Sequence, residues 1–285
     1  MHKTKKSLGQ NFLKSELALR KIIEAGELKN SDVVLEIGPG KGALTERLLE
    51  KAGTVVAVEK DYELFGFLKE KFAQQINSGT LVLIQGDILE FDVTKCARQG
   101  LTHYKIIANI PYNITGAILK KFLTENKQPE LMVLMVQHEV AKRILARDGK
   151  ESILSISVKA YGEPKMVIKV DKRYFSPSPK VDSAVIAIKN ISRKSFYSPL
   201  EEYPLGGGGN ASTPSRKRAT PQEGKEFEER FWEIVKAGFA HKRKKLSSNL
   251  KNLQNYKGLP SVILKQLGNK RAEDLTLKDW IALID

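Results

Sequence analysis

The run Asn109-Ile110-Pro111-Tyr112 is the part of the sequence best suited to chemistry. It follows the apolar residues 106–108, which are typical of a buried strand. In an open α/β sheet, ligands bind beyond the carboxyl ends of the strands. An amide oxygen and an aromatic ring at such a position could hold a planar amine, such as that of a nucleobase. The alternative is an ordinary exit from a strand, in which Pro111 only ends the pairing.

A glycine-rich turn at residues 38–42 follows an earlier strand-like segment and leads into a helical pattern. Gly38 and Gly40 would let a ligand approach the backbone closely at the start of a helix. The spacing also fits a dinucleotide-binding loop, and Glu59 would bind ribose hydroxyls in either case. The glycines alone do not exclude an enzyme that uses a nicotinamide cofactor.

Two acids favour S-adenosylmethionine over a dinucleotide. Glu36 stands just before the glycine turn, where a carboxylate suits a cationic cofactor with an amino-acid tail better than a diphosphate. Asp87 follows the third strand-like segment, where an adenine amine would lie. Glu59 and Asp87 could instead be helix caps or surface acids. Because Asn109 continues the same series of strand ends, the ordered set predicts a methyl-transfer site.

The elements that must position these residues alternate between strands and helices from residue 33 to residue 188. This alternation predicts an α/β fold with a mainly parallel sheet. The predicted strands are residues 33–37, 55–58, 81–84, 105–108, 131–136, 165–170 and 183–188. The predicted helices are residues 16–25, 43–52, 62–72, 115–123 and 138–146.

Three parts of the chain are expected. Residues 1–190 are predicted to form a Rossmann-like methyltransferase domain. Residues 191–224 are rich in Ser, Pro and Gly, which predicts a flexible linker or insertion. Residues 225–285 are predicted to form a small helical domain. Its helical patterns cover residues 226–239, 246–253, 261–267 and 277–284.

The composition favours a polyanionic partner. The 285 residues carry a net charge of +15, and a protein this basic commonly binds nucleic acid. Lys242, Arg243, Lys244 and Lys245 are the predicted RNA contacts, with a solvated helix face as the alternative. The single cysteine, Cys96, excludes an internal disulfide framework and fits a reducing cytoplasm. No membrane span, secretory signal or metal-ligand cluster is expected.

Beyond these single motifs, the chain resembles the small-subunit (16S-type) ribosomal RNA adenine dimethyltransferases. These are related to the macrolide-resistance rRNA methyltransferases and to the mitochondrial transcription factors derived from them. The motifs described above carry the resemblance, and further matching runs extend it over nearly the whole chain. The further runs are residues 9–13, 137–141, 175–185, 241–245 and 271–275.

This resemblance implies roles for individual residues. Asn109 and Ile110 would hold the target adenine beside Pro111, and Tyr112 and Phe175 would stack on it. The implied cofactor is S-adenosylmethionine. Its implied contacts are Gln10, Asn11, Leu13, Glu36, Gly38, Gly40, Glu59, Lys60, Asp87, Ile88 and Asn109.

The implied reaction is dimethylation of the exocyclic amines of two adjacent adenines in a small-subunit rRNA hairpin. The resemblance further implies a cytoplasmic, monomeric enzyme that acts on small-subunit rRNA, within a pre-30S-type particle. Residues 148–154 and the long segment 191–224 depart from the usual family pattern.

Three alternatives are weighed against this function. A large-subunit rRNA adenine methyltransferase would use the same chemistry, although residues 175–185 and the C-terminal runs resemble the small-subunit family more closely. A non-catalytic RNA-binding assembly or transcription factor could keep the fold, but intact Glu59, Asp87 and Asn109 argue against lost chemistry. A DNA adenine methyltransferase is disfavoured because its usual Pro-Pro-Tyr motif is absent.

Overall fold

The computed structural model describes residues 10–99, 101–197, 220–251, 253 and 259–284. The chain divides into two compact units. The first comprises Met1–Leu145 and Gly162–Ile191, and the second comprises Ala146–Tyr161 and Ser192–Asp285. The expected domain boundary at residue 190 thus falls beside Ile191. Residues 146–161, however, belong to the second unit and not to the first, where the sequence placed them.

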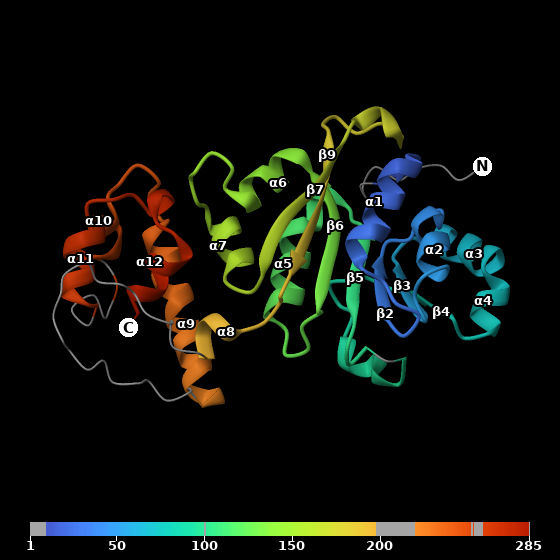
Figure 1. The fold of residues 1–285 in the computed structure, drawn as a ribbon, viewed down its shortest axis with the longest axis horizontal. Helices are drawn as coiled ribbons and strands as arrows, with labels where there is room; N and C mark the ends of the chain where they lie inside the picture. The colour runs from blue at the N-terminus through green and yellow to red at the C-terminus, as the bar shows by residue number, and fades with distance from the viewer. Residues whose placement is uncertain (1–9, 100, 198–219, 252, 254–258, 285) are drawn as a thin grey trace. The chain divides into compact units, whose positions relative to one another are not determined.

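The first unit is built on a seven-stranded sheet with the order β4-β3-β2-β5-β6-β9-β7 (Figure 1). The pairs from β4 to β6 are parallel, whereas β9 runs antiparallel to both β6 and β7. All seven predicted strands are confirmed, with small shifts at their ends. The strands are β2 (Val33–Ile37), β3 (Thr54–Glu59), β4 (Leu81–Gln85), β5 (Lys105–Asn109), β6 (Leu131–Gln137), β7 (Glu163–Val170) and β9 (Ser183–Lys189).

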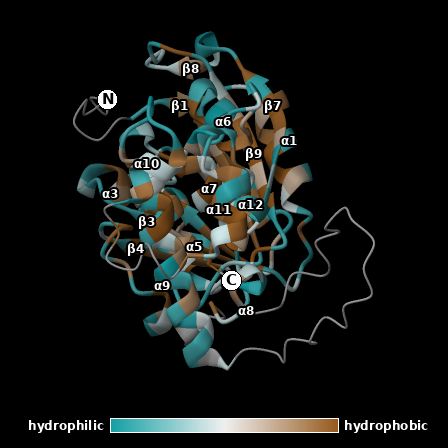
Figure 2. Ribbon diagram, turned by 90° about the vertical axis from the view of Figure 1, so that its left-hand side faces the viewer, coloured by the Kyte–Doolittle hydropathy of each residue, from teal (hydrophilic) through white to brown (hydrophobic). Residues whose placement is uncertain are grey.

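These strands form because their sequences are runs of branched apolar residues. In β6 every residue except the last is buried, as expected for a strand that is covered on both faces. Figure 2 shows the hydrophobic residues running along the strands of the sheet, while the helices carry both polar and apolar residues. The buried sheet is therefore a rigid support for the residues at its strand ends.

Most helices of the first unit lie in the connections between strands of the main sheet, and the first helix precedes β2. The predicted helices are confirmed, although α2 ends at Leu49 and not at residue 52. Lys105 ties the end of α1 to β5, because its Nζ donates to the Gly26 and Glu27 carbonyls at 3.1 and 2.8 Å. The helices are α1 (Glu16–Gly26), α2 (Ala43–Leu49), α3 (Tyr62–Lys71), α4 (Ala73–Asn77), α5 (Thr115–Thr124) and α6 (His138–Leu145). The 3₁₀ turns are η2 (Val93–Gln99), η3 (Tyr112–Ile114) and η4 (Lys172–Tyr174).

A second, two-stranded sheet in this unit escaped the sequence prediction. Strand β1 (Phe12–Leu13) pairs antiparallel with β8 (Phe175–Ser176). Two-residue strands carry too little periodicity to be recognised in a sequence. The pairing matters because it fixes the segment around residue 12 against the segment around residue 175.

The regular secondary structure in the described part of the second unit is helical. Helix α9 begins at Pro221, inside the segment predicted as a linker, because Thr220 and Glu223 form a capping box and proline suits a first turn. The short α8 also lies inside that segment, and residues 198–219 lie outside the described part. The elements are α7 (Ile153–Lys159), α8 (Lys194–Tyr197), α9 (Pro221–Gly238), α10 (Leu246–Leu250), α11 (Ser261–Leu267), η6 (Ala272–Asp274) and α12 (Leu277–Ala282).

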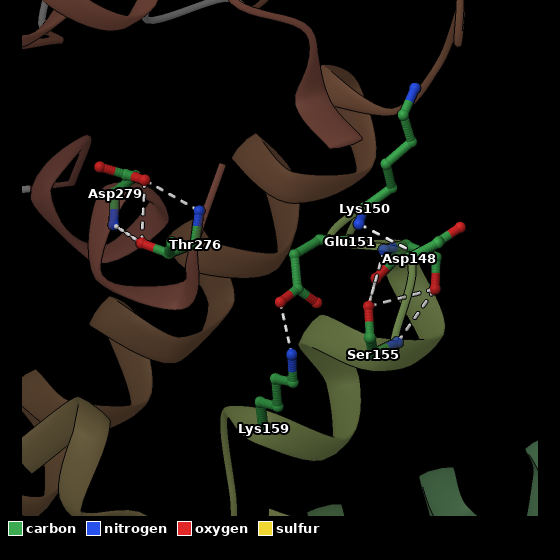
Figure 3. A network of polar contacts seen from close by, with 8 residues as sticks. Asp148, Lys150, Glu151, Ser155, Lys159, Thr276 and Asp279 are labelled. Carbon is green, nitrogen blue, oxygen red and sulfur yellow. Dashed lines mark hydrogen bonds and ion pairs between the residues drawn. The ribbon is translucent and has the colours of Figure 1, made fainter. Parts of the chain in front are cut away.

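Polar side chains define the start of α7, in the segment that departs from the family pattern (Figure 3). Ser152 and Ser155 form a capping box at its first turn. Glu151 accepts from Lys159 Nζ at 2.5 Å, and its backbone N–H donates to the Glu273 carbonyl at 2.7 Å. Segment 148–154 therefore starts a helix that is held within the second unit.

Within the described part of the chain, no helix combines the length and the apolar character needed to cross a lipid bilayer.

Candidate functional site

A pocket opens at the carboxyl ends of β2, β3, β4 and β5 in the first unit, where parallel α/β sheets bind ligands. Segment 10–12 and the turn after β5 complete its wall. Twelve of the predicted site residues line it, together with seven residues that were not predicted. The predicted ones are Gln10, Asn11, Gly38, Gly40, Glu59, Lys60, Asp87, Ile88, Asn109, Ile110, Pro111 and Tyr112.

The glycine turn after β2 requires its glycines. Gly38 and Gly40 have φ of +65° and +61°, in the left-handed region that favours glycine. A Cβ atom on Gly40 would also lie 3.0 Å from Cε1 of Phe12. A larger residue at position 40 would strain the backbone and push against Phe12. The turn thus keeps open the space between the strand ends and segment 10–12.

Glu59, the last residue of β3, holds this turn through hydrogen bonds to backbone N–H groups. Its Oε2 accepts the Gly40 N–H at 3.0 Å, and its Oε1 accepts the Asp61 N–H at 2.9 Å. The side chain is buried, and burial raises the pKa of the carboxyl. A carboxylate held in this way on the pocket wall can accept hydrogen bonds from neighbouring hydroxyl groups of a ligand.

Asp87, which follows β4, forms an ion pair with Lys60. The distance from Lys60 Nζ to Asp87 Oδ2 is 2.7 Å, and Asp87 Oδ1 accepts the Leu89 N–H at 2.9 Å. The hydrogen bond from Lys60 lowers the pKa of Asp87. An ionised acceptor beside the buried apolar side chain of Ile88 suits a ring that carries an amine.

Segment 10–13 is tied to both halves of the pocket. Gln10 Nε2 donates to Asp61 Oδ2 at 2.8 Å, and Asp61 also caps the start of α3. At the other half, Asn109 Nδ2 donates to the Asn11 carbonyl at 3.1 Å. Because the nitrogen of the Asn109 amide is used in this way, Oδ1 is the amide atom that can accept a hydrogen bond from a ligand.

The sequence predicted that Glu36 contacts the cofactor. The structure corrects this prediction, because Glu36 does not line the pocket. Side chains alternate between the two faces of a strand, and the neighbouring Ile37 is the one that reaches the pocket. Glu36 is only 1% exposed and accepts from Thr45 Oγ1 at 2.7 Å. Burial, reinforced by the nearby charge of Glu59, raises the pKa of Glu36 to about 8. In this structure its side chain therefore ties β2 to α2 and does not reach into the pocket.

The raised pKa of Glu36 predicts a pH-dependent stability. Between the ordinary value of 4.5 and about 8, the folded chain keeps a proton that the unfolded chain releases. The contribution of protonated Glu36 to the free energy of unfolding is therefore complete below pH 4.5. It is lost as the pH rises through about 8. We expect Glu36→Gln to gain on the wild type over this range by a few kcal/mol. Urea denaturation at several pH values measures this, and a pH-independent difference would contradict it.

Leu13 and Phe175 are also absent from the lining of the pocket. They are Cα partners in the β1–β8 pair, and both belong to the main hydrophobic core. Phe175 is 3% exposed, and in this structure its ring packs among the apolar side chains of the core. Of the two predicted stacking rings, the structure brings only Tyr112 to the pocket.

The predicted RNA contacts Lys242, Arg243, Lys244 and Lys245 are exposed in the second unit, in the turn between α9 and α10. The buried Asn249 holds this turn, because its Nδ2 donates to the Gly238 and His241 carbonyls at 2.5 and 3.1 Å. Four cations are thus presented together to solvent.

Among the residues that the structure describes, no group of His, Cys, Asp and Glu could hold a metal ion.

Comparison with known proteins decides the family. A family model described as Ribosomal RNA adenine dimethylase matches residues 1–201. The chain belongs to this family.

Relatives of this ribosomal RNA adenine dimethylase agree over almost its full length. The "Ribosomal RNA small subunit methyltransferase A" of Dehalococcoides mccartyi is 38% identical, covering 98% of this chain and 86% of the relative. The protein of the same name from Fusobacterium nucleatum is 37% identical, covering 99% and 97%.

Two solved structures share the fold of this family member. One is the 23S rRNA methyltransferase ErmE, with 25% identity, a TM-score of 0.70 and coverage of 96% of this chain and 98% of that chain. The other is a dimethyladenosine transferase from Plasmodium falciparum, with 26% identity, a TM-score of 0.69 and coverage of 95% of both chains. The Rossmann-like methyltransferase fold expected from the sequence is thus confirmed.

Seven lining residues of this ribosomal RNA adenine dimethylase were missed by the sequence reasoning. Phe12 and Gly86 lie inside runs that were recognised, and Asn113 and Ile114 directly follow the Asn109 run, so proximity to these motifs was a usable signal. Val58 and Leu64 read only as core residues. The seven are Phe12, Ile37, Val58, Leu64, Gly86, Asn113 and Ile114.

Proposed function

We propose that this enzyme dimethylates the exocyclic amines of two adjacent adenines in a hairpin of small-subunit rRNA, using S-adenosylmethionine as the methyl donor. The observation that carries the proposal is the joining of two acids, Glu59 and Asp87, to Asn109 and Tyr112 in one pocket. The names of the 37–38% identical relatives support the choice of the small subunit over the large one.

The donor set fits S-adenosylmethionine. Glu59 would accept the ribose hydroxyls, and Asp87 would accept the adenine amine while Ile88 packs against the ring. The glycine turn and segment 10–12 would enclose the remainder, since the space at Gly40 is one that a Cβ would fill. When bound, the cofactor supplies an electrophilic methyl group on a sulfonium centre.

Asn109 and Ile110 supply the chemistry on the acceptor side. The target amine is a poor nucleophile, because its lone pair is delocalised into the purine ring. Asn109 Oδ1 and the Ile110 carbonyl would accept hydrogen bonds from the amine and stabilise the positive charge that develops on it. Held in this way, the amine nitrogen would face the methyl group that a bound cofactor would supply, and the methylated amine would release its extra proton to solvent.

A stacked adenine must leave its helix before it can reach this pocket. Unstacking costs a few kcal/mol, and stacking on an aromatic ring returns roughly 1 to 3 kcal/mol. Tyr112 lines the pocket and would provide such a face. The pocket must also accept a monomethylated amine for the second transfer.

The substrate proposed is the rRNA within a pre-30S-type particle, bound by a single copy of the chain. The residues that line the pocket all belong to the first unit of one chain, which supports a monomeric enzyme. The decisive experiment measures methyl transfer from labelled cofactor to undermethylated small and large subunits, followed by mapping of the modified adenines. Modification of large subunits alone would overturn the proposal.

We expect the four cations at 242–245 to strengthen RNA affinity. Replacing all four with glutamine should weaken binding and lower the slope of log K against log salt by roughly 0.7 to 0.9 for each phosphate that is no longer neutralised. The matched control replaces four dispersed, exposed lysines of the same unit, namely Lys225, Lys236, Lys265 and Lys278. A salt slope that falls equally in both variants would show that the cluster has no special role.

A further inference from the structure

Tyr112 is held at both ends. Its backbone begins η3 directly after Pro111, at the carboxyl end of β5. Its hydroxyl shares a hydrogen bond with Ser183 Oγ at an O···O distance of 2.5 Å. Burial raises the pKa of this phenol above its ordinary value. A ring that is fixed at its backbone and at its tip cannot swing about χ1 without breaking this bond.

Ser183 is buried in a strand that is paired on both sides. It is the first residue of β9 and is 0% exposed. Strand β9 is paired on both sides, so that Ser183 lies opposite Gln137 of β6 and Val170 of β7. The side chain of Tyr112 therefore reaches from the end of β5, past β6, to an anchor inside the sheet.

A purely structural explanation accounts poorly for this pair. A phenylalanine at position 112 and an alanine at position 183 would fill nearly the same space without any buried polar atom. Paired buried hydroxyls contribute little net stability, because each gives up hydrogen bonds to water. What the pair adds is a defined direction for the aromatic side chain that follows Asn109 and Pro111 in the lining of the pocket.

We propose that Ser183 is a positioning residue for methyl transfer, whose hydroxyl holds the Tyr112 ring in the orientation that stacks on the target adenine. This inference rests on the proposed function. A reacting group that is held in its productive geometry spends more of its time near the attack position, so loosening the ring lowers the rate of transfer. The second transfer is affected in the same way as the first.

The test is a double-mutant cycle with Ser183→Ala and Tyr112→Phe in the full-length enzyme, assayed on undermethylated small subunits. Each single change should lower kcat about tenfold, because each removes the same hydrogen bond. The double variant should be no slower than either single variant. Monomethylated adenine should accumulate, whereas the cofactor Kd from calorimetry should stay unchanged.

Tyr104→Phe is the matched control. Tyr104 is a buried tyrosine next to the opposite end of β5, and its hydroxyl donates to the Lys127 carbonyl at 2.9 Å. This variant loses a buried hydroxyl of the same kind and should keep the wild-type kcat and product ratio.

Losses that multiply in the double variant would overturn the inference, as would a wild-type rate for Ser183→Ala. If Ser183→Ala fails to fold, Tyr112→Phe decides alone, and wild-type kcat in that variant overturns the inference. An inactive wild type in the same assay would instead refute the proposed function itself.

Discussion

Asn109→Ala is expected to lower kcat for methyl transfer by about a hundredfold to a thousandfold, the usual cost of removing one preorganised polar group from a reaction centre. The reason lies in how the amide is oriented. Its Nδ2 donates to the Asn11 carbonyl. In the proposed function, Oδ1 is then the amide atom that would accept from the target amine, where positive charge would develop. The alanine variant has no side-chain acceptor at that place.

The same substitution removes the tie between Asn109 and segment 10–13, so cofactor affinity must be measured beside the rate. One hydrogen bond of this kind is worth about 1 kcal/mol, and we expect the cofactor Kd to rise by no more than about fivefold. Single-turnover assays at saturating cofactor isolate the chemical step. Asn77→Ala, at the exposed end of α4, is the matched control. Near-normal turnover by Asn109→Ala would remove Asn109 from the reaction.

The sheet and the pocket could be predicted from the sequence because both follow from local patterns. Apolar runs fix the strands, and the parallel order brings the strand ends to one edge. Residues at or just beyond the end of a strand, such as Asn109 and Asp87, are therefore brought together whatever the details of packing. The same logic placed Glu59 correctly on the pocket wall.

Residues whose roles depend on long-range contacts could not be placed. Phe175 stands in a proline-rich run that looks exposed, yet its pairing with Leu13 turns the ring into the core. Glu36 lies one residue from the pocket-lining Ile37, and strand alternation sends its side chain toward Thr45. The bond between Tyr112 and Ser183 joins residues 71 positions apart, which no local pattern reveals.

Glu59→Gln is expected to raise the cofactor Kd about a hundredfold. Two charge-assisted hydrogen bonds to the ribose would be weakened, each by about 1.5 kcal/mol. The substitution would also disturb the hydrogen bonds that hold the glycine turn. The carboxylate now accepts one backbone N–H on each oxygen, from Gly40 and from Asp61. A glutamine has a single acceptor oxygen, so its NH₂ group would face one of these two N–H groups and displace the turn.

Binding and chemistry can be separated in this variant, because Glu59 lies on the donor side of the pocket and not beside Asn109. Calorimetry with the cofactor measures the loss of affinity, and kcat at saturating cofactor should recover to near the wild-type value. Glu70→Gln, at an exposed position of α3, is the control for the loss of one negative charge. An unchanged Kd in Glu59→Gln would mean that the carboxylate only supports the turn. A lost kcat with unchanged Kd would instead place Glu59 in the chemical step, which its two backbone hydrogen bonds argue against.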